Sequence, residues 1–241
     1  MNQAACPLLD VTLDQAREGW AGRLEVDLAS FENSGLTLIS REGSYGITTL
    51  KFFDSIVAIC QPALLPILSP LSPGDLLNMS LLLKSLNGHV ANPIGIASIS
   101  YTDSATLKEP PHFGVAHEGN SQEVELILSG CTKDEQEESG VATMPFIFIA
   151  DSVVEKPGAV ASYEIWNGKI AQLGVLTKPE HRGQGLASSA AHAAAKAALA
   201  TGLIPQWRCQ IGNVSSYRLS QKLGFHQVGL QLAIGVVPSS S

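Results

Sequence analysis

The stretch that decides the fold is LGVLTKPEHRGQGLASSAAHAAAKAAL, residues 173–199. An apolar strand is expected to end at Thr177, and an alanine-rich helix to begin directly after a glycine-bearing loop. A helix start presents unpaired N–H groups and the positive end of a dipole, so it attracts phosphate. Gly183 and Gly185 let the backbone come close to such an anion, and Arg182 places a fixed charge beside it. This order of elements predicts a phosphate-binding loop.

A Gly-x-Gly loop alone is weak evidence, and its surroundings carry the interpretation. Residues 206–211 are expected to form a second strand, followed by Asn213 and a helix that ends in KLGF. Asn213 is a natural N-cap for that helix. The chain therefore has two spaced motifs, each at the start of a helix that follows a strand.

These motifs resemble those of the GNAT superfamily of N-acetyltransferases. The acyl-CoA signature of that family, Arg/Gln-x-x-Gly-x-Gly/Ala, is matched by Arg182, Gly185 and Ala187. The second signature, an Asn before a helix that closes on Lys-x-Gly-Phe, is matched by Asn213 and residues 222–225. The resemblance covers residues 112–237. It implies an α/β (α+β) fold, a mixed sheet with helices on both faces.

The resemblance also implies a site for acetyl-CoA between the strands at 170–177 and 206–211. Pantetheine amides would pair with free backbone groups there, and an N–H near Val175 would stabilise the developing oxyanion. The cofactor-binding residues it implies are Val175, Leu176, Thr177, Arg182, Gly183, Gln184, Gly185, Leu186, Ala187, Asn213 and Ser220. No metal is expected.

Transfer of an acetyl group requires that the acceptor amine lose a proton, because an alkylamine with a pKa of about 10 is charged at neutral pH. Glu164 is the first candidate base, sharing a strand face with Ser162 and Trp166; a solvent-facing carboxylate with a water-relayed base is the alternative. Where many family members carry a strand acid, this chain has Ala171 and Gln172.

Many family members carry a tyrosine, a candidate acid, seven residues after the motif Asn, where this chain has Ser220. Tyr217 lies one helical turn earlier. Tyr217 and Ser220 are both candidate catalytic residues. Tyr217 is alternatively a packing residue, and a thiol with a pKa of about 8.5 is a fair leaving group without an acid.

The leading functional hypothesis is an acetyl-CoA-dependent N-acetyltransferase that moves the acetyl group directly to an acceptor amine. The alternative is a catalytically lapsed acyl-CoA-binding sensor or partner module, and O-acyl or longer-chain transfer is a third reading. The acceptor is expected to be a small-molecule or peptide amine. Polyamine, amino acid, antibiotic, peptide N-terminus and protein lysine all stay open.

Composition narrows the class of protein. With 241 residues and a net charge of −7, the chain is not expected to bind nucleic acid. Prolines break the most apolar region, so no membrane partner is expected. The four scattered cysteines predict neither zinc nor disulfides and fit a cytoplasmic location. A homodimer is left open.

The first hundred residues carry no catalytic motif. We expect a smaller α/β N-terminal unit over residues 1–105, with a hairpin of strands at 36–40 and 47–52, two helices at 62–71 and 75–86, the second capped by Ser72 or its neighbours, and a linker at 102–111. No element is predicted before residue 30. Removal of residues 1–105 is expected to leave CoA binding partly intact but to abolish acceptor turnover.

The acetyltransferase domain is expected over 111–238, with its first core strand at 113–117 and an acidic helix at 133–138 that stops at Gly140. Asn167-Gly168 is expected to turn a hairpin between strands at 159–166 and 170–177. His181 is expected to be exposed, and Cys209 to be a small core side chain.

Overall fold

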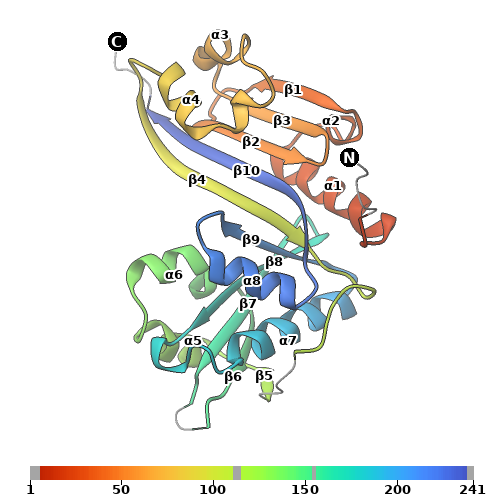
Figure 1. The fold of residues 1–241 in the computed structure, drawn as a ribbon, viewed down its shortest axis with the longest axis vertical. Coiled ribbons are helices and arrows are strands. Elements are labelled where there is room, and N and C mark those ends of the chain that lie inside the picture. Colours follow the sequence, from red (N-terminus) through yellow and green to blue (C-terminus); the bar gives the residue numbers. More distant parts are fainter. Residues whose placement is uncertain (1–5, 111–114, 154–155, 238–241) are drawn as a thin grey trace. The chain divides into compact units, whose positions relative to one another are not determined.

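The structure is a computed structural model that describes residues 6–110, 115–153 and 156–237 (Figure 1). The chain forms two compact units, each built from several segments. Unit 1 comprises Met1–Arg23, Ser100–Arg208 and Ser215–His226, and unit 2 comprises Leu24–Ile99, Cys209–Val214 and Gln227–Ser241. The predicted boundary between residues 105 and 111 stays a prediction.

The strands of unit 1 lie in the order β9-β8-β7-β6-β5. Their bounds are β5 Ala116–Glu118, β6 Phe146–Ala150, β7 Ala159–Trp166, β8 Ile170–Thr177 and β9 Ile204–Gln210. Neighbours pair antiparallel from β5 to β8, whereas β8 and β9 are parallel. The predicted mixed sheet is confirmed, with its parallel pair where the cofactor gap was expected. Of the predicted first core strand at 113–117, residues 113 and 114 lie outside the described residues.

The turn between β7 and β8 follows from its sequence. Asn167 and Gly168 both have positive φ, at 50° and 65°. Asparagine and glycine tolerate this left-handed region far better than other residues. The predicted hairpin between these two strands is confirmed.

Helices cover both faces of the unit 1 sheet. Helix α5 (Ser121–Leu128) and the short helix η3 (Val141–Thr143) bury one face through a cluster that includes Ile127, Val160 and Leu176. Helix α7 (Leu186–Ala200) packs along β6, β7 and β8, and its small buried alanines allow a close approach to the other face. Helix α8 (Val214–Lys222) joins that face, where Trp207 donates to Ser216. The mixed fold class is therefore confirmed.

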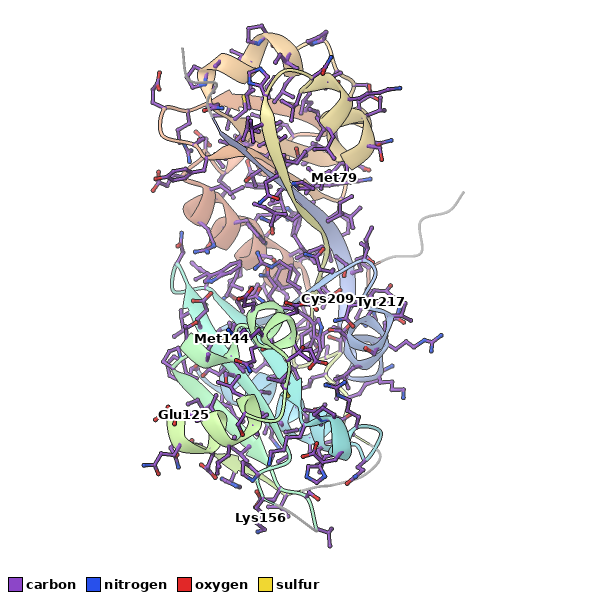
Figure 2. All side chains as sticks on the ribbon, turned by 90° about the vertical axis from the view of Figure 1, so that its left-hand side faces the viewer. Met79, Glu125, Met144, Lys156, Cys209 and Tyr217 are labelled. Atoms are coloured by element: carbon purple, nitrogen blue, oxygen red, sulfur yellow. The ribbon has the colours of Figure 1, made fainter. Side chains whose placement is uncertain are left out.

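Helix α6 (Lys133–Ser139) ends as predicted at Gly140, whose φ is +67°. None of its residues is buried, as expected for the acidic run within it. Gly174 of β8 leaves room for this region, since a Cβ there would lie 2.1 Å from the Ser139 carbonyl and 3.1 Å from the sulfur of Met144 (Figure 2).

Helix α1 (Asp10–Leu24) was not predicted. Its buried residues Leu13, Ala16 and Trp20 recur every three or four positions, the spacing of one helix face. At Gly19, an added Cβ would lie 2.5 Å from Ile170, so the helix backbone comes close to β8. Ala16 and Gly19 on the buried face of α1 weaken its apolar sequence pattern. The same small residues permit the close contact between α1 and β8.

Residues 102–107 belong to the segment for which a linker was predicted, and they are hydrogen-bonded within unit 1. Asp103 is 3% exposed and accepts hydrogen bonds from Leu9, Thr12, Ala105 and Thr106. The polar composition of this segment predicted a linker. In the structure its polar side chains form hydrogen bonds with one another.

Unit 2 has the strand order β1-β3-β2-β10-β4. The bounds are β1 Gly35–Ser40, β2 Gly46–Phe52, β3 Ser55–Cys60, β4 Val90–Tyr101 and β10 His226–Val237. The predicted hairpin of the first two strands is wrong, because β3 lies between them, parallel to β1 and antiparallel to β2. Every residue of β3 is buried. A wholly apolar-facing strand of this kind suits a place between two other strands of the sheet.

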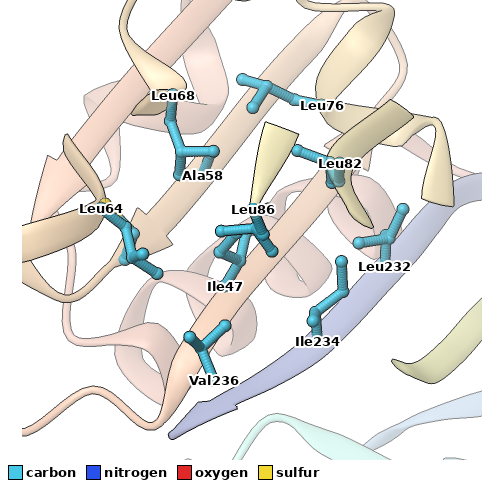
Figure 3. Close-up of a cluster of buried hydrophobic side chains, with 11 residues drawn as sticks. Ile47, Ala58, Leu64, Leu68, Leu76, Leu82, Leu86, Leu232, Ile234 and Val236 are labelled. Atoms are coloured by element: carbon cyan, nitrogen blue, oxygen red, sulfur yellow. The ribbon is translucent and has the colours of Figure 1, made fainter. Parts of the chain in front are cut away.

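Short helices complete unit 2: α2 Ala29–Glu32, η1 Pro62–Leu64, α3 Leu65–Leu68, η2 Asp75–Leu77 and α4 Met79–Ser85. Leucines from these helices pack with Ile47, Leu232 and Ile234 of the strands (Figure 3). The two longer helices expected here are shorter, since four prolines interrupt the region. Asn78, rather than Ser72, caps α4.

Candidate active site

Strands β8 and β9 separate part of the way along their length. Their pairing begins at Ile170 and Ile204 and ends at Leu173 and Trp207. Beyond that point β8 continues to Thr177 and β9 to Gln210. The two strands are therefore not paired throughout, and backbone groups of β8 are left without a strand neighbour on one side.

The orientation of these backbone groups follows from the flanking hydrogen bonds. Lys178 N–H donates to Gly158 at 3.1 Å, so even-numbered residues of β8 bond towards β7. Ile204 N–H donates to Lys169 at 3.0 Å, so odd-numbered residues bond towards β9. Val175 is the first odd-numbered residue beyond the last pair. Its N–H and carbonyl point into the gap, as do those of Thr177.

The glycine loop presents a run of free backbone donors. Within the part of the chain that the structure describes, the N–H groups from Gly183 to Ser188 donate no hydrogen bond, and the first is that of Ser189, to Gly185. Gly183 and Gly185 have φ of +77° and +85°. Apart from Gly183 and its two chain neighbours, no described atom lies within 4 Å of the position that a Cβ of Gly183 would take. Residues 183–188 thus form an open cradle of N–H groups, a geometry that can hold an anion.

Side chains of the loop turn away from the cradle. Arg182 pairs with Glu135 of α6 at 2.7 Å and its Nε reaches the Thr177 carbonyl at 3.4 Å. Gln184 folds back onto the Glu180 carbonyl at 3.2 Å. The sequence did not indicate this ion pair between Arg182 and Glu135. An anion bound at the loop would compete with Glu135 for the Arg182 guanidinium.

His181 precedes Arg182 and was expected to be exposed. It is buried, at 5% exposure, in the short helix η4 (Pro179–His181). Lys178 is also buried, at 6%. Their burial follows from the tight turn after β8 rather than from their polarity.

Glu164 lies on β7 and is half-buried. Its Oε1 accepts a hydrogen bond of 2.7 Å from the indole N–H of Trp166, so the two side chains share a strand face as predicted. In register, Glu164 lies beside Gln172, which lies beside Gln206. The candidate base therefore belongs to a row of polar side chains across three strands, next to the point where β8 and β9 separate.

A buried network that sequence reasoning missed anchors this row. Gln206 donates to Gln172 at 2.5 Å, Tyr101 donates to Gln206, and Trp20 donates to both Tyr101 and Gln206. Burial raises the pKa of Tyr101 well above its ordinary value, so its hydroxyl keeps its proton. The network ties the two strands together just before they part.

The two candidate acids on α8 differ in their surroundings. The Ser220 hydroxyl is buried and donates to the Tyr217 carbonyl at 2.7 Å. The Tyr217 hydroxyl accepts a hydrogen bond from the Gln221 side chain at 3.0 Å; Figure 2 labels Tyr217. The Ser220 hydroxyl proton is therefore already engaged within α8.

The second motif has a structural role as well. Asn213 stands directly before α8, at the N-cap position, and its N–H donates to Gln210 at 2.9 Å. Gly224 has a φ of +84°, and an added Cβ would lie 1.9 Å from the Thr106 carbonyl. The glycine of KLGF is thus required by the close passage of residues 102–107.

Among the described residues, no group of three or more His, Cys, Asp or Glu side chains could hold a metal ion. No helix in the described part of the chain is long and apolar enough to cross a membrane. Cys209 is a buried core side chain, as predicted.

Comparison with known proteins agrees with the motifs. Residues 153–230 match the family model of GNAT acetyltransferases. The resemblance to the GNAT superfamily is therefore confirmed, over a stretch that contains β7, β8, the glycine loop, α7, β9 and α8. No curated protein matches the chain.

Several solved structures are similar to this chain. They include a putative GNAT acetyltransferase from Novosphingobium aromaticivorans (18% identity, 61% of this chain, 68% of that chain, TM-score 0.48). Another is a GNAT acetyltransferase from Colwellia psychrerythraea (14%, 64% of this chain, 61% of that chain, 0.46). A third is a GCN5-related N-acetyltransferase-like protein from Streptococcus suis (16%, 66% of this chain, 67% of that chain, 0.45). The chain thus covers about three fifths to two thirds of their lengths, and likeness at this level carries no argument about function.

Proposed function

We propose that this protein is an acetyl-CoA-dependent N-acetyltransferase that transfers the acetyl group directly to an acceptor amine. The observation that carries the proposal is that two features occur together, one on β8 and one on the glycine loop after it. The unpaired Val175 N–H faces the gap between β8 and β9, and the free N–H groups from Gly183 to Ser188 follow it in the chain.

The residues present fit CoA. Free N–H groups at a helix start bind a diphosphate, and the empty space at Gly183 admits it without a clash. The open edge of β8 from Val175 to Thr177 can pair with the amides of the pantetheine arm, as an added strand would. Acetyl-CoA supplies an acyl group activated as a thioester.

In this mechanism Val175 N–H donates to the acyl oxygen as negative charge develops there. Glu164 accepts the proton of the acceptor ammonium, directly or through a water molecule, so that the neutral amine can attack. As the new carbon–nitrogen bond forms and the carbon–sulfur bond breaks, the attacking nitrogen releases its second proton to the solvent. Tyr217 donates a proton to the departing sulfur and recovers one from the solvent. Trp166 holds the Glu164 carboxylate in place through its indole N–H.

Two measurements test the proposal. Acetyl-CoA binding is measured by calorimetry, and release of free CoA is measured with a thiol reagent over a panel of amines. We expect binding, and CoA release that depends on the amine and yields an amide product. Binding without release for any amine would instead indicate an acyl-CoA-binding module. Absence of binding would overturn the proposal.

A further inference from the structure

Leu173, the last residue of β8 that pairs with β9, has a carbonyl that is held by a neighbouring side chain. The side-chain amide of Gln172, the residue before it, donates to this carbonyl at 2.9 Å. Gln172 is 4% exposed, so the hydrogen bond is shielded from water. Because Val175 follows only two residues after Leu173, the bond lies at the point where the gap between β8 and β9 begins.

The Gln172 amide is itself held by a buried chain of hydrogen bonds. Its oxygen accepts from the Gln206 side-chain amide at 2.5 Å, and the Gln206 oxygen accepts from the Tyr101 hydroxyl and the Trp20 indole N–H. Trp20 also donates to the Tyr101 hydroxyl at 2.7 Å. None of these four side chains is more than 4% exposed. The chain therefore runs from α1 to the backbone of β8 through buried groups.

The first donor of the chain fixes the direction of every later bond. An indole N–H can only donate, so the Gln206 atom that faces it is the amide oxygen. The Gln206 NH2 group then faces the Gln172 oxygen, which leaves the Gln172 NH2 group for the Leu173 carbonyl. Burial raises the pKa of Tyr101, so its hydroxyl keeps the proton that it donates to Gln206. Each glutamine amide is therefore held in one of its two orientations.

The backbone just before Val175 is held on two sides. Turning either amide would leave buried polar groups without partners, which is costly in surroundings of low dielectric constant, so the hold on Leu173 is firm. Gly174 is in register with Ser162 of β7, and a Cβ there would lie 2.1 Å from the Ser139 carbonyl. The direction of the next N–H into the gap is thus set by its surroundings.

We propose that Gln172 and Gln206 are positioning residues that set where β8 leaves β9 and thereby orient the Val175 N–H towards the gap. This inference rests on the proposed function, in which that N–H donates to the acyl oxygen. Neither glutamine contacts the substrate in this mechanism, because both act through the Leu173 carbonyl. A donor that is held in place before the reaction needs no reorganisation as negative charge develops, and so stabilises that charge better.

The first experiment removes each glutamine side chain in turn and measures the CoA-release reaction. Gln172→Met and Gln206→Met nearly keep the side-chain volume but remove the hydrogen bonds. We expect Gln172→Met to lower kcat by at least about tenfold, because a small misplacement at the reacting centre costs up to about a hundredfold. Acetyl-CoA affinity should change little, since residues 183–188 are untouched. Gln206→Met, one bond further from Leu173, should lower kcat by a smaller factor.

Stability should follow the opposite order. Gln206 takes part in three hydrogen bonds and Gln172 in two, so Gln206→Met should have the lower melting temperature. A purely structural role would make the loss of kcat follow the loss of stability. If Gln206→Met lost as much kcat as Gln172→Met, or if kcat were unchanged in both, the inference would be overturned while the transferase proposal stood.

Thr12→Val is the matched control for a buried defect elsewhere in unit 1. It removes the hydrogen bond from the Thr12 hydroxyl to Asp103, of 3.0 Å. We expect a lower melting temperature and an unchanged kcat, measured well below the melting transition. A loss of kcat equal to that of Gln172→Met would contradict the assigned role, because any buried defect would then slow the reaction.

An NMR measurement on the parent protein tests the key hydrogen bond without turnover or acetyl-CoA. Scalar coupling across the bond is measured between the Gln172 side-chain ¹⁵N and the Leu173 carbonyl ¹³C. The backbone bond from Lys178 to Gly158, of 3.1 Å, is the reference within the same spectrum. We expect both couplings. If the reference coupling were observed and that of Gln172 were missing, the inference would be overturned.

The Val175 ¹H–¹⁵N signal reports whether the effect reaches the gap. It should move in Gln172→Met and move in the same direction, by less, in Gln206→Met, whose altered side chain is on another strand. The signals of residues 183–188 should stay in place, and Thr12→Val should move none of these. A Val175 signal that is unchanged in both glutamine variants would overturn the inference even if the protein bound no acetyl-CoA.

Discussion

At Asp103, hydrogen-bond donors from two parts of the sequence meet one carboxylate. Leu9 N–H and the Thr12 hydroxyl donate to one oxygen, and Ala105 and Thr106 donate to the other. Burial alone would raise the pKa of Asp103, but these hydrogen bonds outweigh it and hold the pKa below its ordinary value. The carboxylate thus anchors the start of α1 to residues 102–107.

Because the folded-state pKa of Asp103 is lowered, its ionised form stabilises the fold above the unfolded pKa of about 3.9. That stability is lost as the pH falls through the folded-state value. Asp103→Asn should lower the free energy of unfolding by about 1–3 kcal/mol at pH 7. The amide NH2 group of asparagine would face N–H and hydroxyl donors that now bond to the carboxylate. Urea unfolding at pH 7 and at low pH measures this.

Asp54→Asn, at an exposed turn, is the control for the Asp103 variant and should change stability little. The difference between Asp103→Asn and the parent protein should shrink as the pH falls. A constant difference at every pH would contradict an electrostatic role for Asp103.

At the scale of an element, α7 combines two functions. Its buried alanines bring the helix close to the sheet, and its first turn leaves backbone N–H groups free. Both depend on the glycine before it, since Gly185 holds a φ of +85° that other residues adopt only at a cost.

Gly185→Glu should therefore abolish measurable acetyl-CoA affinity, because it adds a negative charge and a side chain where the diphosphate is proposed to bind. Gly202→Glu is a matched control at the other end of α7. Gly202 also has a positive φ, of +78°, and open space where a Cβ would be.

Both variants should lose comparable stability in thermal unfolding. Calorimetry should show unchanged acetyl-CoA binding for Gly202→Glu. If Gly185→Glu retained the affinity of the parent protein, the phosphate site would lie elsewhere.

At the scale of the whole molecule, successive segments of the chain belong alternately to unit 1 and unit 2. Residues 1–105 contribute α1 and Tyr101 to unit 1, and also the strands β1, β2 and β3 of unit 2. Trp20 and Tyr101 are 1% and 0% exposed, so they belong to the core of unit 1.

The structure changes the expectation for a truncated chain. A chain of residues 106–241 would lack Trp20 and Tyr101, and loss of one buried aromatic side chain alone costs about 3–5 kcal/mol. It would also leave β10 without its partner β2. We expect no cooperative thermal transition by circular dichroism and no acetyl-CoA binding. A fragment that melts cooperatively and binds acetyl-CoA would contradict this.

Local signals in the sequence determined the acetyltransferase-like half of the protein. The extents of β7 and β8, the turn at Asn167 and Gly168, and the glycine loop before α7 follow from neighbouring residues. Such features depend on backbone preferences and on helix termini, which act over a few residues. The family motifs lie in the same segment.

Only the tertiary structure decided the contacts between distant parts of the chain. The parallel pairing of β1 with β3, the packing of α1 on β8 and the burial of His181 have no local signal. The same holds for Arg23 and Arg208, which meet at Trp166. The physical reason is that burial and pairing are set by which surfaces meet when the chain folds, and a residue's immediate neighbours in sequence do not encode that choice.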